Sequence, residues 1–106
     1  MTRPPGFHLH PEAVNDIVEI RDFLVAESPA AALRFREQIL DAIRRLVAFP
    51  ELGFRRPELS SRPLRFLLVG EYLIAYAPEE QPLLVVAVLH GRRNPKLIAA
   101  ELSGRK

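Results

Sequence analysis

The sequence predicts an α+β domain in which an antiparallel helix hairpin packs on one face of a mainly antiparallel sheet. Two observations lead to this prediction. The first half of the chain has the hydrophobic period of two amphipathic helices, whereas the second half has short apolar runs separated by turn residues. A short alternating segment precedes the helices. The expected order of elements is therefore β-α-α-β-β-β, in a single domain over residues 1–106.

The expected first strand is Phe7-His8-Leu9-His10, which alternates apolar and polar side chains. Pro11 then suits the first position of a helix, and the helical period continues to about Glu27. The apolar arc of this segment is broad, which is typical of a helix that packs on two neighbours. Its acidic residues are expected on the opposite side, away from the core: Glu12, Asp16, Glu19 and Asp22.

A second helix is predicted to begin directly after the first. Ser28 is a favourable N-cap and Pro29 a favourable first helical residue. The apolar period then runs to about Phe49, where Pro50 stops the helix. Because the connection is so short, the two helices should be antiparallel neighbours.

Beyond this point the pattern changes from helical to extended. We expect a loop over Glu51 to Pro63 and two strands, Leu64 to Val69 and Tyr72 to Ala77, joined by a two-residue turn. The run from Leu83 to His90 is apolar on both faces, which indicates a strand that is central or covered on two sides. Residues 96–102 fit either a short last helix or an extra strand.

Composition excludes several classes of protein. Cysteine is absent, so there is neither a disulfide framework nor thiolate chemistry. The longest apolar run is far shorter than the ~20 residues of a membrane-spanning helix. The first residues lack the apolar region of a signal peptide, so we expect a cytoplasmic protein with no membrane association. The net charge is only +2, but the second half holds two basic groups: Arg55, Arg56, Arg62 and Arg65, then Arg92, Arg93 and Lys96.

Few residues suggest chemistry. There is no glycine-rich phosphate loop, and none of the serines lies in a nucleophile elbow. His8, His10 and His90 would approach one another if the first strand paired with the last, but strand histidines are more often hydrogen-bonded surface residues. We therefore expect no metal and no cofactor. Tyr72 and Tyr76 should share one sheet face, most simply as packing aromatics with hydrated hydroxyl groups.

Several segments together resemble the plasmid-stabilisation toxins of the ParE branch of the ParE/RelE superfamily. The resemblance covers roughly residues 7–98 and rests on these segments: Pro11-Glu12-Ala13, Ser28-Pro29 with Ala32, residues 49–53, residues 56–59, Leu64-Arg65, residues 69–76, and Val88-Leu89-His90-Gly91-Arg92-Arg93. It implies the RelE/ParE-like fold and the toxin component of a type II toxin–antitoxin system. It also implies a cognate antitoxin with a DNA-binding part, expected to be of the ribbon-helix-helix type, and a C-terminal segment that wraps the toxin.

Within that superfamily the resemblance leaves two modes of action, inhibition of DNA gyrase by ParE-like members and ribosome-dependent mRNA cleavage by RelE-like members. Cleavage needs a base for the 2′-hydroxyl proton and cations around the phosphate. RelE-like members place a basic residue where this chain has Leu73, and a Tyr near the C-terminus, whereas no Tyr or His follows Arg93 here. These departures favour a non-catalytic gyrase inhibitor over a RelE-like endoribonuclease.

For the target contact we expect Arg65, Arg92, Arg93 and the C-terminal residues 97–106, with Leu97 as the apolar candidate. We expect no sequence-specific nucleic-acid binding. A third alternative is a non-toxic remnant that only binds its antitoxin, since part of the broad apolar helix surface would suit an antitoxin groove. No residue is assigned to that groove from the sequence.

Overall fold

The computed structural model describes residues 6–105, and the predicted α+β class is confirmed. Its elements in chain order are β1 (Phe7–Leu9), α1 (Pro11–Glu27), α2 (Pro29–Ala48), β2 (Phe54–Arg55), β3 (Arg65–Val69), β4 (Tyr72–Ala77), β5 (Leu83–His90) and α3 (Pro95–Ser103). Both long helices and the three main strands lie where the sequence predicts them. The residues that suggest the lack of a signal peptide, 1–5, lie outside the described part. No helix within residues 6–105 is both long and apolar enough to cross a membrane.

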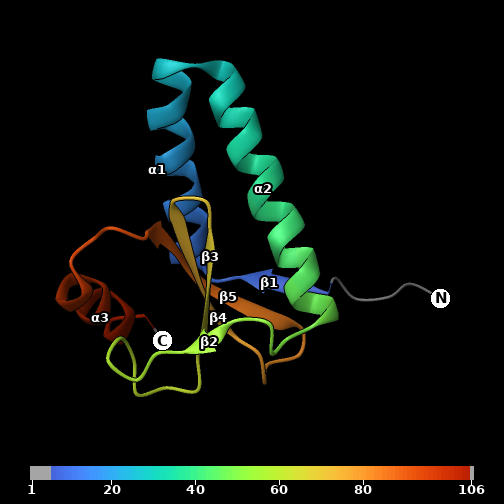
Figure 1. Ribbon diagram of the computed structural model, residues 1–106, viewed down its shortest axis with the longest axis vertical. Coiled ribbons are helices and arrows are strands. Elements are labelled where there is room, and N and C mark those ends of the chain that lie inside the picture. The colour runs from blue at the N-terminus through green and yellow to red at the C-terminus, as the bar shows by residue number, and fades with distance from the viewer. Residues whose placement is uncertain (1–5, 106) are drawn as a thin grey trace.

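The five strands form one mixed sheet in the order β1-β5-β4-β3-β2. β1 runs parallel to β5, and the other neighbours are antiparallel. β5 is therefore an inner strand, and helices cover it on both faces (Figure 1). This double cover explains why the run from Leu83 to His90 is apolar on both sides.

The helix hairpin lies on one face of the sheet and α3 on the other (Figure 1). Its two helices start as predicted, because His10 Nδ1 accepts from the amide of Glu12 at α1 and Ser28 Oγ accepts from the amide of Ala31 at α2. The hairpin-side core joins α2 to the sheet and contains Phe35, Ile39, Ile43, Leu46, Ile74, Tyr76, Val85 and Val88. The free end of the hairpin, where α1 meets α2, extends beyond the sheet.

One segment differs from the sequence prediction, and another decides between two predicted alternatives. The predicted loop from Glu51 to Pro63 contains a short strand, β2, in which Phe54 pairs with Phe66 and Arg55 with Arg65. A two-residue strand has no detectable period, so no sequence pattern marks it. Residues 96–102 form a helix rather than a strand, and Asn94 caps α3 by accepting from the amide of Lys96.

The expectation that Asp16 lies on a solvent-facing side of α1 is wrong. Its side chain is 11% exposed and forms an ion pair with Arg105, which is 8% exposed. Asp16 Oδ2 lies 2.6 Å from Arg105 Nη1, and Asp16 Oδ1 lies 2.9 Å from Arg105 Nη2. The hydrogen bonds with Asp16 raise the pKa of Arg105, so the guanidinium stays charged. The pair fastens the end of the chain to α1.

The same pair also completes the hydrogen bonding of β5. β1 ends opposite Val85, and a bulge leaves Val86 without a partner on β4. The backbone there turns its groups toward the open edge, where the amide of Val88 donates to Asp16 Oδ2 and the carbonyl of Val86 accepts from Arg105 Nη1. Two charged side chains thus replace the strand neighbour that β5 lacks along this part of its edge.

Candidate target-binding surface

The turn from β5 to α3 carries the basic residues that the sequence singles out. Its backbone is fixed by hydrogen bonds: the amide of Gly91 donates to the carbonyl of Glu71, and the amide of Arg93 donates to the carbonyl of His90. His90 Nδ1 also accepts from the amide of Arg92 at 3.2 Å. Arg92 and Arg93 are therefore presented by an ordered turn on the rigid end of an inner strand.

Arg92, Arg93 and Leu97 lie together in this turn and the first turn of α3, and all three are exposed. Leu97 is 59% exposed, which is unusual for a leucine in a helix that packs on a core. Arg93 Nη1 contacts Glu101 Oε1 at 2.7 Å, and both side chains are 40% exposed. A half-exposed ion pair of this kind is worth at most about 1 kcal/mol, so a partner with a carboxylate can displace Glu101 from Arg93.

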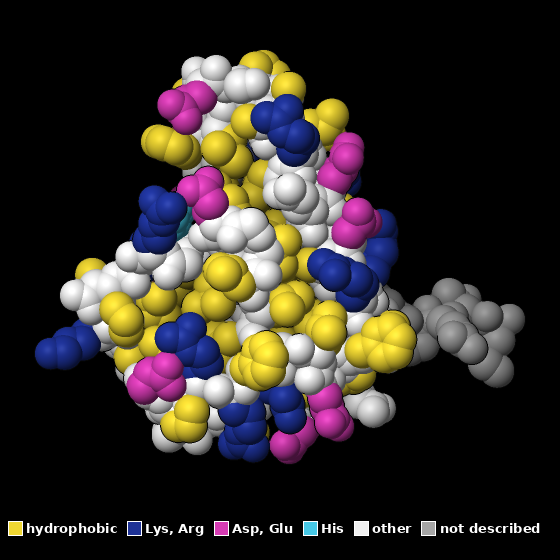
Figure 2. Space-filling model, viewed as in Figure 1, with side chains coloured by type: hydrophobic (Ala, Val, Ile, Leu, Met, Phe, Trp, Pro, Cys, Tyr) yellow, Lys and Arg dark blue, Asp and Glu magenta, His cyan; other side chains and the backbone are white. Residues whose placement is uncertain are grey.

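Leu68 extends this surface, and sequence reasoning missed it. It lies on β3 on the face that also holds α3, and it is 62% exposed. A Cβ atom at Gly91 would lie 2.9 Å from Leu68 Cδ1, so the leucine side chain approaches the basic turn closely. The available sequence signal was the spacing of Phe66 and Leu68, which places both side chains on one face of β3. The structure adds that Phe66 is buried and Leu68 is not. Figure 2 shows hydrophobic side chains gathered over the sheet between α3 and α2, with Lys and Arg side chains among them.

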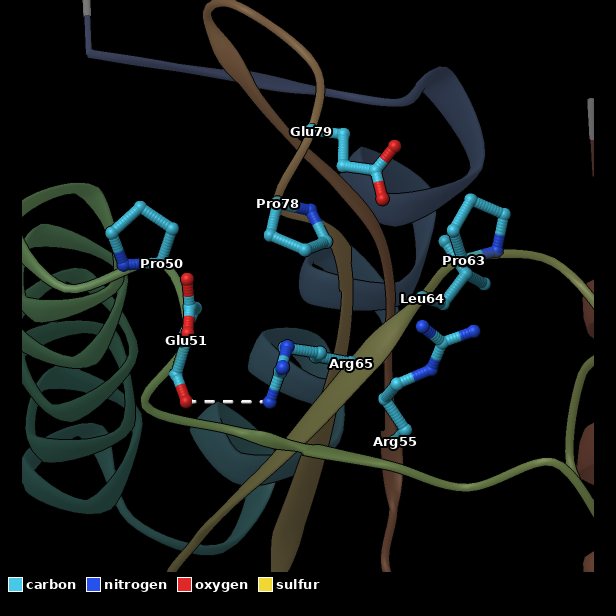
Figure 3. Close-up of a pocket in the computed structure, with 8 residues that line it drawn as sticks. All are labelled: Pro50, Glu51, Arg55, Pro63, Leu64, Arg65, Pro78 and Glu79. Atoms are coloured by element: carbon cyan, nitrogen blue, oxygen red, sulfur yellow. Dashed lines mark hydrogen bonds between the residues drawn. The ribbon is translucent and has the colours of Figure 1, made fainter.

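Arg65 lies apart from this surface. It pairs with Tyr76 across β3 and β4, whereas His90 pairs with Tyr72, so Arg65 and the basic turn lie at opposite ends of β4. Four residues of strand separate them by about 13 Å. Arg65 Nη1 donates to the carbonyls of Gly53 at 2.8 Å and Glu51 at 3.4 Å. Its guanidinium thus braces the loop that follows α2 (Figure 3).

The pocket beside Arg65 has a volume of about 350 Å³. Arg55 and Arg65 enter it from neighbouring strands, and Glu51 and Glu79 line it as well (Figure 3). The acidic and basic side chains balance one another. The pocket therefore has no net charge that would select an anion or a cation.

Tyr76 is fully buried. The sequence predicts a hydrated hydroxyl group, and this prediction is wrong because backbone groups bind the hydroxyl instead. The hydroxyl donates to the carbonyl of Pro50 at 2.7 Å and accepts from the amide of Gly53 at 2.8 Å. Burial raises its pKa. Tyr72 lies on the same face, as predicted, and packs edge-on against Phe35 with ring centroids 4.8 Å apart. Burial and the charge of Glu71 raise the pKa of Tyr72.

The three histidines do not converge. β1 is parallel to β5 with His8 opposite Leu84, so His90 lies at the far end of β5 from His8. Within residues 6–105 no group of histidine and acidic side chains is arranged to hold a metal ion.

Comparison with known proteins decides the family. Residues 7–95 match the family model described as the ParE toxin of the type II toxin–antitoxin system parDE. The chain belongs to the ParE toxin family. Among its relatives is Toxin ParE2 of Mycobacterium tuberculosis, from strains CDC 1551 / Oshkosh and ATCC 25618 / H37Rv. Each is 27% identical over 110 residues, which cover 99% of this chain and 97% of the relative.

The family match covers only part of the candidate target-binding surface of this ParE family member. Leu68, Arg92 and Arg93 lie inside the matched residues, whereas Leu97 and Arg105 lie beyond Pro95, where the match ends. The residues after Pro95 thus add an exposed leucine and the arginine of a buried ion pair to the part that the family model describes. Membership of a type II toxin family also implies an antitoxin as partner.

Proposed function

We propose that this chain is a cytoplasmic toxin that inhibits DNA gyrase by binding to it, without catalysis, and that its cognate antitoxin neutralises it. The observation that carries this proposal is the family match over residues 7–95 together with the exposed surface of Arg92, Arg93, Leu68 and Leu97. Arginine is among the residue types that supply most of the affinity at protein interfaces, and exposed leucines beside it add apolar area that binding would bury.

The surroundings of Leu73 support a binding mode of action over mRNA cleavage. Leu73 stands where RelE-like members place a basic residue, and its side chain is 6% exposed in the α3-side core. The Leu73 side chain therefore packs into the protein and carries no charged group that could contact a phosphate. The buried hydroxyl of Tyr76 is engaged by the backbone on both sides and cannot act as a proton donor or acceptor for a substrate.

A supercoiling assay with purified toxin and gyrase tests the proposal. We expect inhibition by the wild-type chain, and at least a tenfold loss of potency for the double variant Arg92→Ala, Arg93→Ala, because loss of a central interface arginine commonly costs more than about 1.4 kcal/mol. The matched control is Arg34→Ala, Arg36→Ala, which removes two exposed arginines from α2 and should leave the potency unchanged.

Three results would contradict the proposal. Gyrase that keeps its activity at a stoichiometric excess of toxin would exclude gyrase as the target. Ribosome-dependent cuts in a primer-extension assay would show that the chain is an endoribonuclease. Normal growth on expression without the antitoxin would show a non-toxic chain that only binds its partner.

A further inference from the structure

His90 fastens the basic turn to the end of β5 through two hydrogen bonds. Its backbone carbonyl accepts from the amide of Arg93, and its side-chain Nδ1 accepts from the amide of Arg92 at 3.2 Å. The carbonyl accepts at every pH, because the backbone does not titrate. The bond to Arg92 is different, since an imidazole nitrogen accepts a hydrogen bond only while it carries no proton. The position of the Arg92 backbone therefore depends on the protonation state of His90.

The same hydrogen-bond pattern recurs nearby with a side chain that does not titrate. Asn94 Oδ1 accepts from the amide of Lys96 at 2.8 Å, two residues further along the chain, as His90 Nδ1 does from Arg92. Bonds of this kind fix the backbone of a turn locally. An asparagine at position 90 would make the same bond. What the histidine adds is a response to acid, because the charge of an imidazole ordinarily changes between about pH 5 and pH 8.

The groups around the His90 ring attract a positive charge. The side chain is 45% exposed, and its Nε2 lies 3.9 Å from Glu71 Oε1 in the β3–β4 turn. Tyr72 packs edge-on against the ring, with ring centroids 5.7 Å apart. Two more carboxylates, Glu19 and Glu27 of α1, line the groove that the ring borders, and no lysine or arginine is among its described lining residues. The ring thus faces three carboxylates on one side and the amide of the basic turn on the other.

Protonation of the ring exchanges one interaction for another. The new proton on Nδ1 faces the amide proton of Arg92, so their hydrogen bond is lost. The positive charge meanwhile strengthens the attraction of Nε2 to Glu71. The turn is then held by the bonds of its neighbours, Gly91 and Arg93, and not at Arg92 itself. Because the Arg92 side chain extends from this released backbone, ordering it at an interface costs more free energy.

We propose that His90 is a positioning residue for target binding: its neutral ring fixes Arg92 in the orientation that contacts the target, and protonation of the ring releases it. The proposal rests on the proposed function for the role of Arg92 at the target. Binding should therefore weaken as the pH falls through the range in which an imidazole gains its proton. Because one hydrogen bond is involved, the expected loss of affinity is about threefold to tenfold.

Calorimetry of toxin binding to gyrase at about pH 6 and about pH 8 tests the proposal with two variants of His90. His90→Asn keeps an acceptor for the Arg92 amide but does not titrate, so it should bind with similar affinity at both pH values. His90→Phe keeps a ring that packs on Tyr72 but has no acceptor, so it should bind more weakly at both. The wild type should match His90→Asn at about pH 8 and His90→Phe at about pH 6.

The matched control is His10→Asn. His10 Nδ1 accepts from the amide of Glu12 in the same two-residue pattern, but it lies at the start of α1, where its own amide donates to the carbonyl of Val85. This replacement should leave the pH dependence of binding unchanged. If the affinity of the wild type changes with pH no more than that of His90→Asn, the proposal is overturned, because the titrating groups then lie elsewhere on the toxin or on gyrase.

A measurement on the toxin alone separates this proposal from the choice of target. Exchange of the Arg92 amide proton with water is measured by NMR and divided by the intrinsic rate at each pH. We expect this ratio to rise about threefold or more from about pH 8 to about pH 6 in the wild type, and to stay constant in His90→Asn. A toxin that follows this pattern but does not bind gyrase would contradict only the proposed target. Equal ratios at both pH values in the wild type would overturn the positioning role of His90, whatever the toxin binds.

Discussion

The ion pair between Asp16 and Arg105 allows a quantitative prediction for the variant Arg105→Met. The substitution keeps a long side chain but leaves the carboxylate of Asp16, 11% exposed, with the amide of Val88 as its remaining hydrogen-bond donor. Loss of one partner from a buried ion pair costs about 3–5 kcal/mol. A domain of this length loses roughly 4–5 °C in Tm for each kcal/mol, so Tm should fall by roughly 12–25 °C.

Differential scanning calorimetry measures this change, and the exposed pair of Asp41 and Arg44 is the matched control. Those two side chains are 71% and 68% exposed, and Asp41 Oδ1 lies 3.3 Å from Arg44 Nη1. Arg44→Met should therefore cost less than about 1 kcal/mol. The double variant Asp16→Leu, Arg105→Met should recover part of the stability lost in Arg105→Met, because it removes the unpaired carboxylate. If Arg105→Met lowers Tm no more than Arg44→Met does, the reasoning from burial is refuted.

Three further predictions concern the loop after α2, high pH and the core. A Cβ atom at Gly53 would lie 2.7 Å from the carbonyl oxygen of Phe66, so Gly53→Ala should lower Tm markedly, whereas Gly104→Ala, where the nearest atom is 3.5 Å away, should not. Burial raises the pKa of Tyr76 above 10.0, so the folded state favours the neutral phenol; the resulting stability is complete below about pH 10 and declines above it. Tm measured from pH 8 to 11 should thus fall more steeply for the wild type than for Tyr76→Phe, and parallel curves would contradict this. Ile39→Ala, at 2% exposure, should cost about 2–5 kcal/mol in chemical unfolding, in contrast to Arg92→Ala, which should leave the unfolding free energy within about 0.5 kcal/mol.

The elements that the sequence predicts well are those whose signals are local. Ser28-Pro29 marks the junction of the two helices because the cap and the first helical turn are decided by adjacent residues. The strand from Leu83 to His90 is recognisable because a strand covered on both faces has apolar residues at nearly every position. These local signals also place the basic turn after β5, which supplies two of the predicted contact residues.

The features that the sequence does not predict depend on contacts between distant residues. Asp16 and Arg105 are separated by 89 positions, and each resembles an ordinary surface residue in its own segment. The role of Arg65 as a brace depends on where the loop after α2 folds back, which no period encodes. The separation of Arg65 from Arg92, in contrast, follows from the hairpin register, because a turn at Gly70-Glu71 sets Arg65 opposite Tyr76.

The closure of β5 by Asp16 and Arg105 has a consequence for the fate of a shortened chain. When another strand pairs with the whole edge of the most hydrophobic strand, the backbone groups of that edge stay paired after the last residues are lost. Here they do not, because one of the pairing side chains lies at the end of the chain. Removal of Arg105 by a nonsense mutation or a carboxypeptidase would leave the carbonyl of Val86 without its donor, and the neighbouring amide of Val88 with an unpaired Asp16 as its only cover. Self-association through that strand would then take the toxin out of solution.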